Sequence, residues 1–138
     1  MDMMEERMLR WHPKASIDLN RIVWYCSQKF GKSAARQVRN RIWHDVELLQ
    51  SHPQLGRVEP LLVGCTSLEY RSLVVDKVTK IIYTVHQEYV YIHLLWDVRR
   101  DEESLSQATL HRYQEFESDP IWTSEPLAEY GKVEERGE

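Results

Sequence analysis

The chain has 138 residues, of which 42% are hydrophobic and 29% charged, with a formal net charge of −4 and two cysteines. This length and apolar content predict one globular domain; no apolar run approaches the ~18 residues that cross a bilayer, and the acidic N-terminus does not resemble a secretory signal. Cys26 and Cys65 lack CxxC or Cys/His spacing, so we expect neither a disulfide framework nor a metal site. We also expect a cytoplasmic protein without a cofactor.

The first predicted elements are a strand and a helix. Met8 to Trp11 is a short apolar and basic run closed by Pro13, which is typical of a strand that ends in a turn. Ser16 can cap the helix that follows, and Gly31 offers a left-handed C-cap. Between them, apolar residues recur at helical spacing: Ile17, Ile22, Val23, Cys26 and Phe30.

A second helix is predicted directly after Gly31. Ser33 can cap it, and Pro53 ends the segment. Its apolar stripe consists of Ala35, Val38, Ile42, Val46 and Leu49. Because only a short link separates the two helices, they should form an antiparallel hairpin whose stripes face a common partner. Four tryptophans are expected in the core between this hairpin and a sheet: Trp11, Trp24, Trp43 and Trp96.

That sheet is predicted from three β-rich runs, Tyr70 to Val75, Val78 to Val85 and Tyr89 to Val98. The breaks at Asp76-Lys77 and at residues 86–88 are short enough for hairpin turns, so we expect an antiparallel meander. Asp101 to Phe116 then returns to a helical pattern. The predicted order is β-α-α-β-β-β-α, an α+β fold with the N-terminal strand and helical hairpin packed on a small antiparallel sheet.

Charge divides the chain into a basic body and an acidic end. Residues 1–100 hold 15 Lys and Arg against 11 Asp and Glu, whereas residues 101–138 hold 3 against 11. We predict one domain over residues 1–116 and an acidic, disordered tail over residues 117–138, which could fold over the basic body and restrain it. Trp122 would be exposed in this tail, where an aromatic residue can act as a binding anchor.

Several short motifs follow one another in a characteristic order. Through them the sequence resembles the RelE/ParE toxin superfamily over roughly residues 8 to 110. The motifs are Ala15, Asp18, Leu19 and Ile22 in the first helix; Tyr25, Phe30 and Gly31 at its end; Pro53 and Gly56 in the loop; Tyr70, Arg71 and Leu73; Lys80 to Tyr83; and Arg99, Arg100 and Asp101. The resemblance implies the toxin fold described above and a cognate antitoxin protein as partner in a hetero-oligomer.

Four cations mark the candidate binding site: Arg71, Lys80, Arg99 and Arg100. All lie on, or at the end of, strands of the predicted meander, so their side chains could converge on one concave patch suited to a phosphate. The structural alternative is that Arg71 pairs with Asp76 or Glu69, and the two later arginines with Asp97 or Asp101. Taken singly, each of the three arginines fits this alternative better, and Lys80 has the stronger functional claim.

The resemblance also offers two mechanisms. In the branch that cleaves mRNA on the ribosome, residues matching Arg71, Lys80, Tyr83 and Arg100 stabilise the scissile phosphate without a metal. That branch also has a second basic residue and an acid or base where this chain has Leu73 and Leu105-Ser106. The incomplete set favours the ParE-like branch, known for poisoning DNA gyrase, and Tyr83 more often packs at a core edge than carries a proton.

The leading hypothesis is therefore the toxin of a type II toxin–antitoxin, or plasmid stabilisation, module. It would inhibit growth by binding a macromolecular target such as DNA gyrase. The first alternative is a ribosome-dependent mRNA endonuclease that uses the four residues Arg71, Lys80, Tyr83 and Arg100. The second is a non-toxic regulatory module that binds the antitoxin.

Overall fold

The computed structural model describes residues 6–118 and 122–124, and it has the predicted mixture of helices and strands. The elements are β1 (Met8–Trp11), α1 (Pro13–Phe30), α2 (Lys32–Leu48), β2 (Arg57–Val58), the 3-10 helix η2 (Pro60–Leu62), β3 (Arg71–Val75), β4 (Thr79–Val85), β5 (Tyr89–Asp97) and α3 (Glu102–Ser118). The predicted α+β order is confirmed. The two short elements β2 and η2, in the loop after the hairpin, were not predicted.

The strands form one five-stranded sheet in the order β1-β5-β4-β3-β2. β3, β4 and β5 form the predicted antiparallel meander. At the first hairpin turn both Asp76 and Lys77 have positive φ, as a type I′ turn requires. β1, in contrast, pairs with β5 in the parallel direction, which the long connection through two helices permits.

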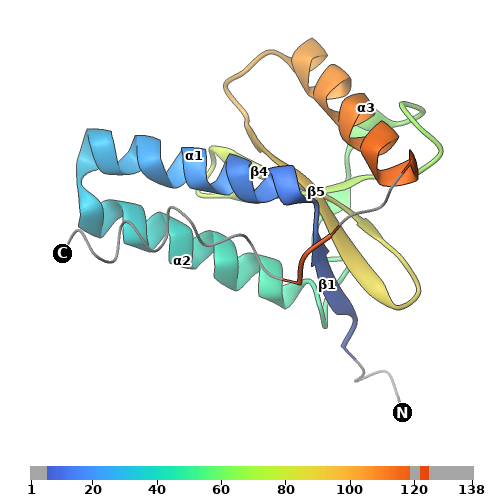
Figure 1. The fold of residues 1–138 in the computed structure, drawn as a ribbon, viewed down its shortest axis with the longest axis horizontal. Coiled ribbons are helices and arrows are strands. Elements are labelled where there is room, and N and C mark those ends of the chain that lie inside the picture. Colours follow the sequence, from blue (N-terminus) through green and yellow to red (C-terminus); the bar gives the residue numbers. More distant parts are fainter. Residues whose placement is uncertain (1–5, 119–121, 125–138) are drawn as a thin grey trace.

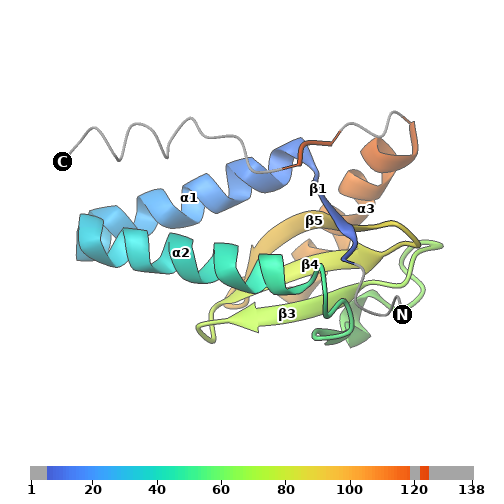
Figure 2. The same ribbon diagram turned by 90° about the horizontal axis from the view of Figure 1, so that it is seen from below.

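Two hydrophobic cores lie on opposite faces of the sheet, so the fold has three layers. The helical hairpin α1-α2 covers one face, and α3 together with η2 covers the other (Figures 1 and 2). The first core includes Leu19 of α1, Ile42 of α2 and Ile81 of β4. The second includes Ile82, the next residue of β4, and Leu105 of α3. Neighbouring strand residues thus serve different cores, because side chains alternate along a strand.

Helix α1 does not begin at the predicted cap. Ser16 is buried inside the helix, whereas the His12 imidazole caps it, its Nδ1 accepting a hydrogen bond of 3.0 Å from the Lys14 N–H. The prediction was wrong because Pro13 can occupy the first helical turn, so the helix begins closer to the N-terminus than predicted. Likewise α2 begins at Lys32 with Gly31 as its N-cap, so the predicted cap Ser33 lies inside the helix.

Gly31 joins the two helices with φ 94° and ψ 170°. The positive φ agrees with the prediction of a glycine-dependent turn, but this ψ lies outside the left-handed helical region that a common C-cap adopts. Such a combination is open almost only to glycine. Gly31 therefore sets the sharp reversal that brings α2 back along α1.

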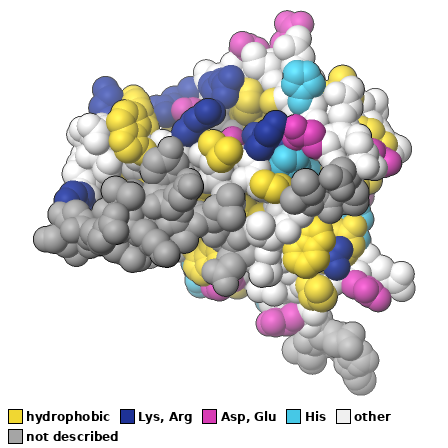
Figure 3. Space-filling view, in the orientation of Figure 1, with side chains coloured by type: hydrophobic (Ala, Val, Ile, Leu, Met, Phe, Trp, Pro, Cys, Tyr) yellow, Lys and Arg dark blue, Asp and Glu magenta, His cyan; other side chains and the backbone are white. Residues whose placement is uncertain are grey.

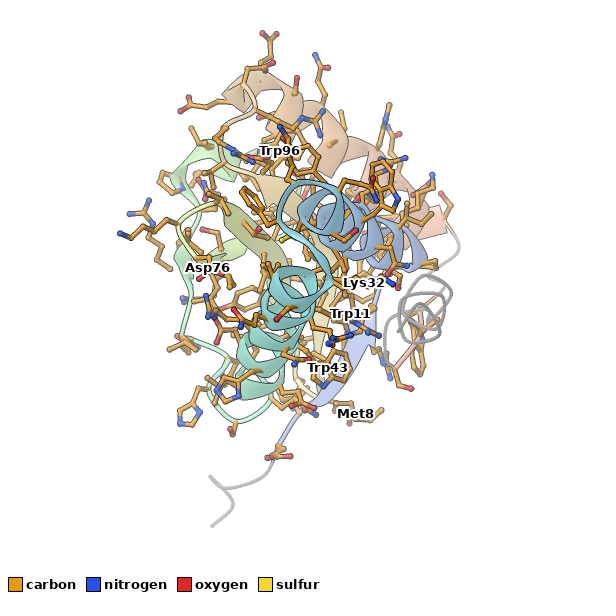
Figure 4. The ribbon with its side chains drawn as sticks, turned by 90° about the vertical axis from the view of Figure 1, so that its left-hand side faces the viewer. Met8, Trp11, Lys32, Trp43, Asp76 and Trp96 are labelled. Atoms are coloured by element: carbon orange, nitrogen blue, oxygen red, sulfur yellow. The ribbon has the colours of Figure 1, made fainter. Side chains whose placement is uncertain are left out.

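The tryptophans divide differently from the prediction. Trp11 is fully buried and stacks on Trp43 at 6.1 Å between ring centroids, between β1 and α2 (Figure 4). Trp96 is buried in the core under α3, not under the hairpin. Trp24 is 55% exposed, so its placement in the core was wrong. It follows Val23, which faces the core, and therefore falls off the apolar stripe of α1.

An ion pair ties α1 to α3. Arg112 of α3 binds both carboxylate oxygens of Asp18 at 3.1 Å and donates to the His93 carbonyl at 2.6 Å. Asp18 also accepts the Leu95 N–H of β5. This motif aspartate thereby links both helical layers to strand β5.

The described residues include only part of the predicted tail. Helix α3 continues to Ser118, two residues beyond the predicted domain end, and Trp122–Ser124 lie beside β1. Residues 119–121 and 125–138 lie outside the described residues, so the tail prediction remains a prediction. Among the described helices, none is long and apolar enough to cross a membrane.

Candidate functional site

Arg71 opens β3 and holds the preceding loop. It shares the hairpin side of the sheet with Leu73 and Val75, because these residues alternate with those of the other face. Its guanidinium donates to the Gly56 carbonyl at 2.7 Å and to the Gln54 side-chain oxygen at 3.1 Å. Neither Asp76 nor Glu69 is its hydrogen-bond partner in these contacts. Arg71 therefore acts as a loop anchor in this structure.

Tyr83 lies directly opposite Arg71 in the β3-β4 register and anchors the same loop. Its hydroxyl donates to the Pro53 carbonyl at 2.8 Å and accepts the Gly56 N–H at 2.8 Å. Burial raises the pKa of this phenol, although the Gly56 hydrogen bond and the charge of Arg71 oppose the change. The interpretation of Tyr83 as a packing residue agrees with this buried, fully bonded geometry.

The motif residues Pro53, Gly56, Arg71 and Tyr83 thus meet in one structural unit, which we call the loop latch. Gly56 has no room for a side chain, because a Cβ there would lie 2.5 Å from the Ser72 carbonyl oxygen and 2.7 Å from the Tyr83 hydroxyl. Close backbone approach, not catalysis, explains this glycine. The sequence motif therefore marks a folding contact.

Lys80 lies on the opposite face of the sheet. It belongs to the α3 side with Ile82, and its ammonium contacts Glu59 at 2.8 Å. The lysine side chain is 14% exposed and the glutamate side chain 1%. Burial alone would raise the pKa of Glu59, but hydrogen bonds from Lys80, Leu61 and Ser72 hold it below its usual range. Lys80 is therefore largely buried and paired with Glu59.

The two arginines after β5 also diverge. Arg99 forms a bidentate pair with Asp97, with distances of 2.9 and 2.7 Å. This hydrogen bonding lowers the pKa of the Asp97 carboxyl. Arg100 turns to the other face, where its guanidinium lies 4.2 Å from the centroid of the Trp96 ring. The predicted pairing with Asp97 thus holds for Arg99.

The four cations do not form the predicted common patch. Arg71 lies on the hairpin side, whereas Lys80 and Arg100 lie on the α3 side. Strand alternation separates side chains by the full thickness of the sheet even where their backbones are neighbours. Their role in binding remains a prediction, but it cannot rest on a convergent arrangement in this structure.

A different cavity is present at the free end of the helical hairpin. It has a volume of about 630 Å³ and lies between the two helices, the β3-β4 turn and the end of β5. Its apolar lining includes Ile22, Cys26 and Val38, and Phe30 stands at its border with 73% of its surface exposed. We call this cavity the hairpin groove.

Charged side chains surround the hairpin groove. Arg41 of α2 pairs with Asp76 in the β3-β4 turn, and Arg99 pairs locally with Asp97 at the end of β5. Lys29 lies 5.6 Å from the ring centroid of Tyr25. In Figure 3, Lys and Arg side chains gather over the α1 side of the molecule. An apolar floor with a cationic border is suited to an amphipathic acidic segment.

The residues of this groove were not among the predicted binding residues, apart from Arg99. Tyr25 and Phe30 stood out only as motif residues and as part of the apolar pattern of α1. The sequence did contain a signal for Phe30. This apolar residue directly precedes Gly31, which ends the first helix, so it lies at the connection between the two helices. Only the packing of α1 on α2 shows that the Phe30 ring remains outside the core.

A helical hairpin on one face of a meander and a single helix on the other define the RelE/ParE class of fold. One solved structure with this fold is described as the chromosomal ParDE TA system from P. aeruginosa. The similarity covers 70% of this chain and 98% of that chain, with a TM-score of 0.54 and 20% sequence identity. No curated protein matches the sequence.

Residues 9–102 match the model of the family described as the ParE toxin of the type II toxin–antitoxin system, parDE. Because the match spans more than half of the sequence, the chain belongs to this toxin family. The resemblance to the RelE/ParE superfamily, with its ParE-like branch favoured, is therefore confirmed.

Proposed function

We propose that this toxin inhibits growth by binding DNA gyrase, without cutting RNA, and that a cognate antitoxin neutralises it. The observation that supports this proposal is the separation of Arg71 and Tyr83 from Lys80 and Arg100 by the sheet. Phosphate cleavage without a metal needs donors that converge on the developing charge. These four residues do not converge.

The hydrogen bonds and the ion pair of Tyr83 and Lys80 also support a toxin that does not cut RNA. Both functions of the Tyr83 hydroxyl, as donor and as acceptor, are engaged in the loop latch. Lys80 is neutralised by buried Glu59. A nuclease would need to break these contacts before either side chain reached RNA, at a cost of about 1–3 kcal/mol for each buried group left unpaired.

The hairpin groove is the proposed antitoxin site. The similar solved structure is described as a chromosomal ParDE TA system. An acidic amphipathic helix from the partner would cover Phe30 and replace Asp76 and Asp97 as partners of Arg41 and Arg99. Arg41 and Arg99 would then be paired in both states, with carboxylates of their own chain in the free toxin and with carboxylates of the antitoxin in the complex.

Growth experiments with induced expression test the mechanism. Expression without antitoxin should arrest growth and activate a DNA-damage reporter, and purified toxin should inhibit DNA supercoiling by gyrase. Primer extension on cellular message should show no codon-phased cuts. Codon-phased cuts that vanish in Arg100→Ala, a variant at an exposed cation, would instead establish the mRNA endonuclease.

The non-toxic alternative has its own outcome. Wild-type protein that accumulates in folded form without arresting growth, yet binds the antitoxin, would identify a regulatory module and overturn the gyrase proposal.

A further inference from the structure

The outer edge of the sheet at β1 is occupied by a segment from the other end of the chain. Thr123 pairs with Trp11 in the antiparallel direction: the Trp11 N–H donates to the Thr123 carbonyl at 2.7 Å, and the Thr123 N–H donates to the Trp11 carbonyl at 3.0 Å. β5 already binds the inner edge of β1. Trp122–Ser124, here called the edge segment, therefore adds a short sixth strand position.

The edge segment also contributes an aromatic ring to a stack on the α3 side. The Arg10 guanidinium lies 4.0 Å from the ring centroid of Tyr89 and 4.4 Å from that of Trp122. His86 stacks on Tyr89, with 4.4 Å between centroids and 14° between planes. Four side chains, from β1, the β4-β5 turn, β5 and the edge segment, thus build one continuous stack.

Arg10 depends on these rings more than on hydrogen bonds at its Nε. This nitrogen is buried, and it has no hydrogen-bond partner among the described residues. A guanidinium placed against aromatic faces is attracted by the negative faces of the rings, and more strongly when it is partly desolvated. Loss of the Trp122 ring would leave this cation with one aromatic partner in place of two.

Alternation along the edge segment determines which side chain meets the stack. Because Thr123 is opposite Trp11, the preceding Trp122 falls on the face that carries Arg10 and His12. Beside it is a cavity of about 300 Å³ lined by Arg10, Tyr89, Tyr91, Phe116, Glu117 and Trp122. A shift of one residue would turn the indole to the opposite face.

We propose that the β1 edge and the Arg10–Tyr89 stack form a peptide-binding surface. Its ligand is an extended segment with an aromatic residue directly before the residue that pairs with Trp11. The chain's own edge segment fills this surface in the free toxin. Backbone hydrogen bonds supply affinity for any strand, and the aromatic position supplies selectivity. This surface is separate from the hairpin groove and does not depend on the mechanism of toxicity.

Because the chain's own edge segment occupies the β1 edge, an external peptide must compete with it for binding. A tethered ligand has an effective concentration on the order of millimolar, so a weak external peptide cannot compete with an intact edge segment. A variant with a weakened edge segment should therefore bind external peptide, whereas the wild type should not.

The test uses the full chain and a fluorescently labelled peptide of residues 119–127, with fluorescence anisotropy as the measurement. Trp122→Ala should bind the peptide at least tenfold more tightly than wild type, and Trp122→Ala with Arg10→Ala should lose this gain. Trp24→Ala, which removes another exposed indole, is the matched control and should behave as wild type. A peptide with the order of Trp122 and Thr123 exchanged should not bind.

A second measurement follows the edge directly. Amide hydrogen exchange at Trp11 should accelerate at least tenfold in Trp122→Ala and in Thr123→Pro, which removes the N–H that donates to the Trp11 carbonyl. Added peptide should restore protection in Trp122→Ala. Equal peptide binding by wild type and Trp122→Ala, or no binding by Trp122→Ala and Thr123→Pro while both remain folded, would overturn the proposal. Should Trp122→Ala fail to fold, Thr123→Pro alone decides between these outcomes.

Discussion

Arg71 and Tyr83 face each other across β3 and β4, and both side chains bond the same loop around Gly56. Two residues that the resemblance would assign to RNA cleavage thus hold a structural loop in place. This relationship leads to predictions in which stability and toxicity change separately.

Tyr83→Phe removes a hydroxyl that satisfies two backbone groups. The Pro53 carbonyl and the Gly56 N–H lose their partner, so the free energy of unfolding should fall by about 2 kcal/mol. Urea denaturation measures this change. Tyr113→Phe, which loses only an exposed hydrogen bond to Ser67, is the control and should change stability by less than about 0.5 kcal/mol. Toxicity should persist in folded Tyr83→Phe; its complete loss would support the nuclease.

Gly56→Ala should disrupt the loop latch by steric overlap. The new Cβ would lie 2.5 Å from the Ser72 carbonyl oxygen, which belongs to β3 and cannot move without the strand. We expect a loss of roughly 2 kcal/mol or more, measured as a shift of the urea midpoint. Leu55→Ala, at the exposed neighbouring position, should be close to wild type. Equal stability of the two variants would contradict the close backbone approach.

Lys80→Ala should destabilise the fold because Glu59 remains buried without its ammonium partner. The expected loss is about 3 kcal/mol at neutral pH. Replacing Glu59 by Gln in the same chain should recover much of it, since the buried charge is removed together with the lysine. A double-mutant cycle measures the coupling, and additive losses would exclude the pair as a significant interaction.

His12 predicts a pH dependence of stability. Burial, the charge of Arg112 and that of Lys14 lower its pKa to about 4, although Glu115 acts in the opposite direction. The unfolded chain binds a proton near pH 6.5, so it binds more protons than the folded chain between about pH 6.5 and pH 4. Stability should therefore fall on acidification through this window, by up to about 3 kcal/mol from His12.

His12→Asn is the variant that tests this dependence. Asparagine retains a side-chain oxygen for the helix cap but does not titrate. Its stability should decline less steeply between pH 6.5 and pH 4 than that of wild type, as measured by urea denaturation at each pH. Parallel curves for the two proteins would show that His12 is not the responsible group.

Phe30→Ser tests the hairpin groove. Because the ring is largely exposed, the melting temperature should change little, whereas affinity for the antitoxin should fall at least tenfold through the loss of an aromatic anchor. Val63→Ser, at an equally exposed position outside the groove residues, is the matched control. Calorimetry with purified antitoxin measures both affinities, and equal values would place the antitoxin elsewhere.

Local patterns in the sequence determined the secondary structure well. The predicted runs beginning at Tyr70, Val78 and Tyr89 differ from β3, β4 and β5 by one residue at one end. Periodicity and turn residues act over a few neighbours, so they can be recognised without knowledge of the fold. The ordered motifs likewise identified the toxin family before any contact was known.

Faces and registers were decided only by the tertiary structure. In the β4-β5 pair, Ile82 is opposite Leu94 but Tyr83 is opposite Ile92, which leaves His93 as an extra residue in β5. Such a bulge, and the pairing of Trp11 with Thr123, depend on partners distant in the sequence. The sequence by itself determined that Arg71 and Lys80 lie on strands. Only the packing of the two cores decided that the sheet separates them. Alternation along a strand shows that neighbouring side chains lie on opposite faces, but not which helices cover each face.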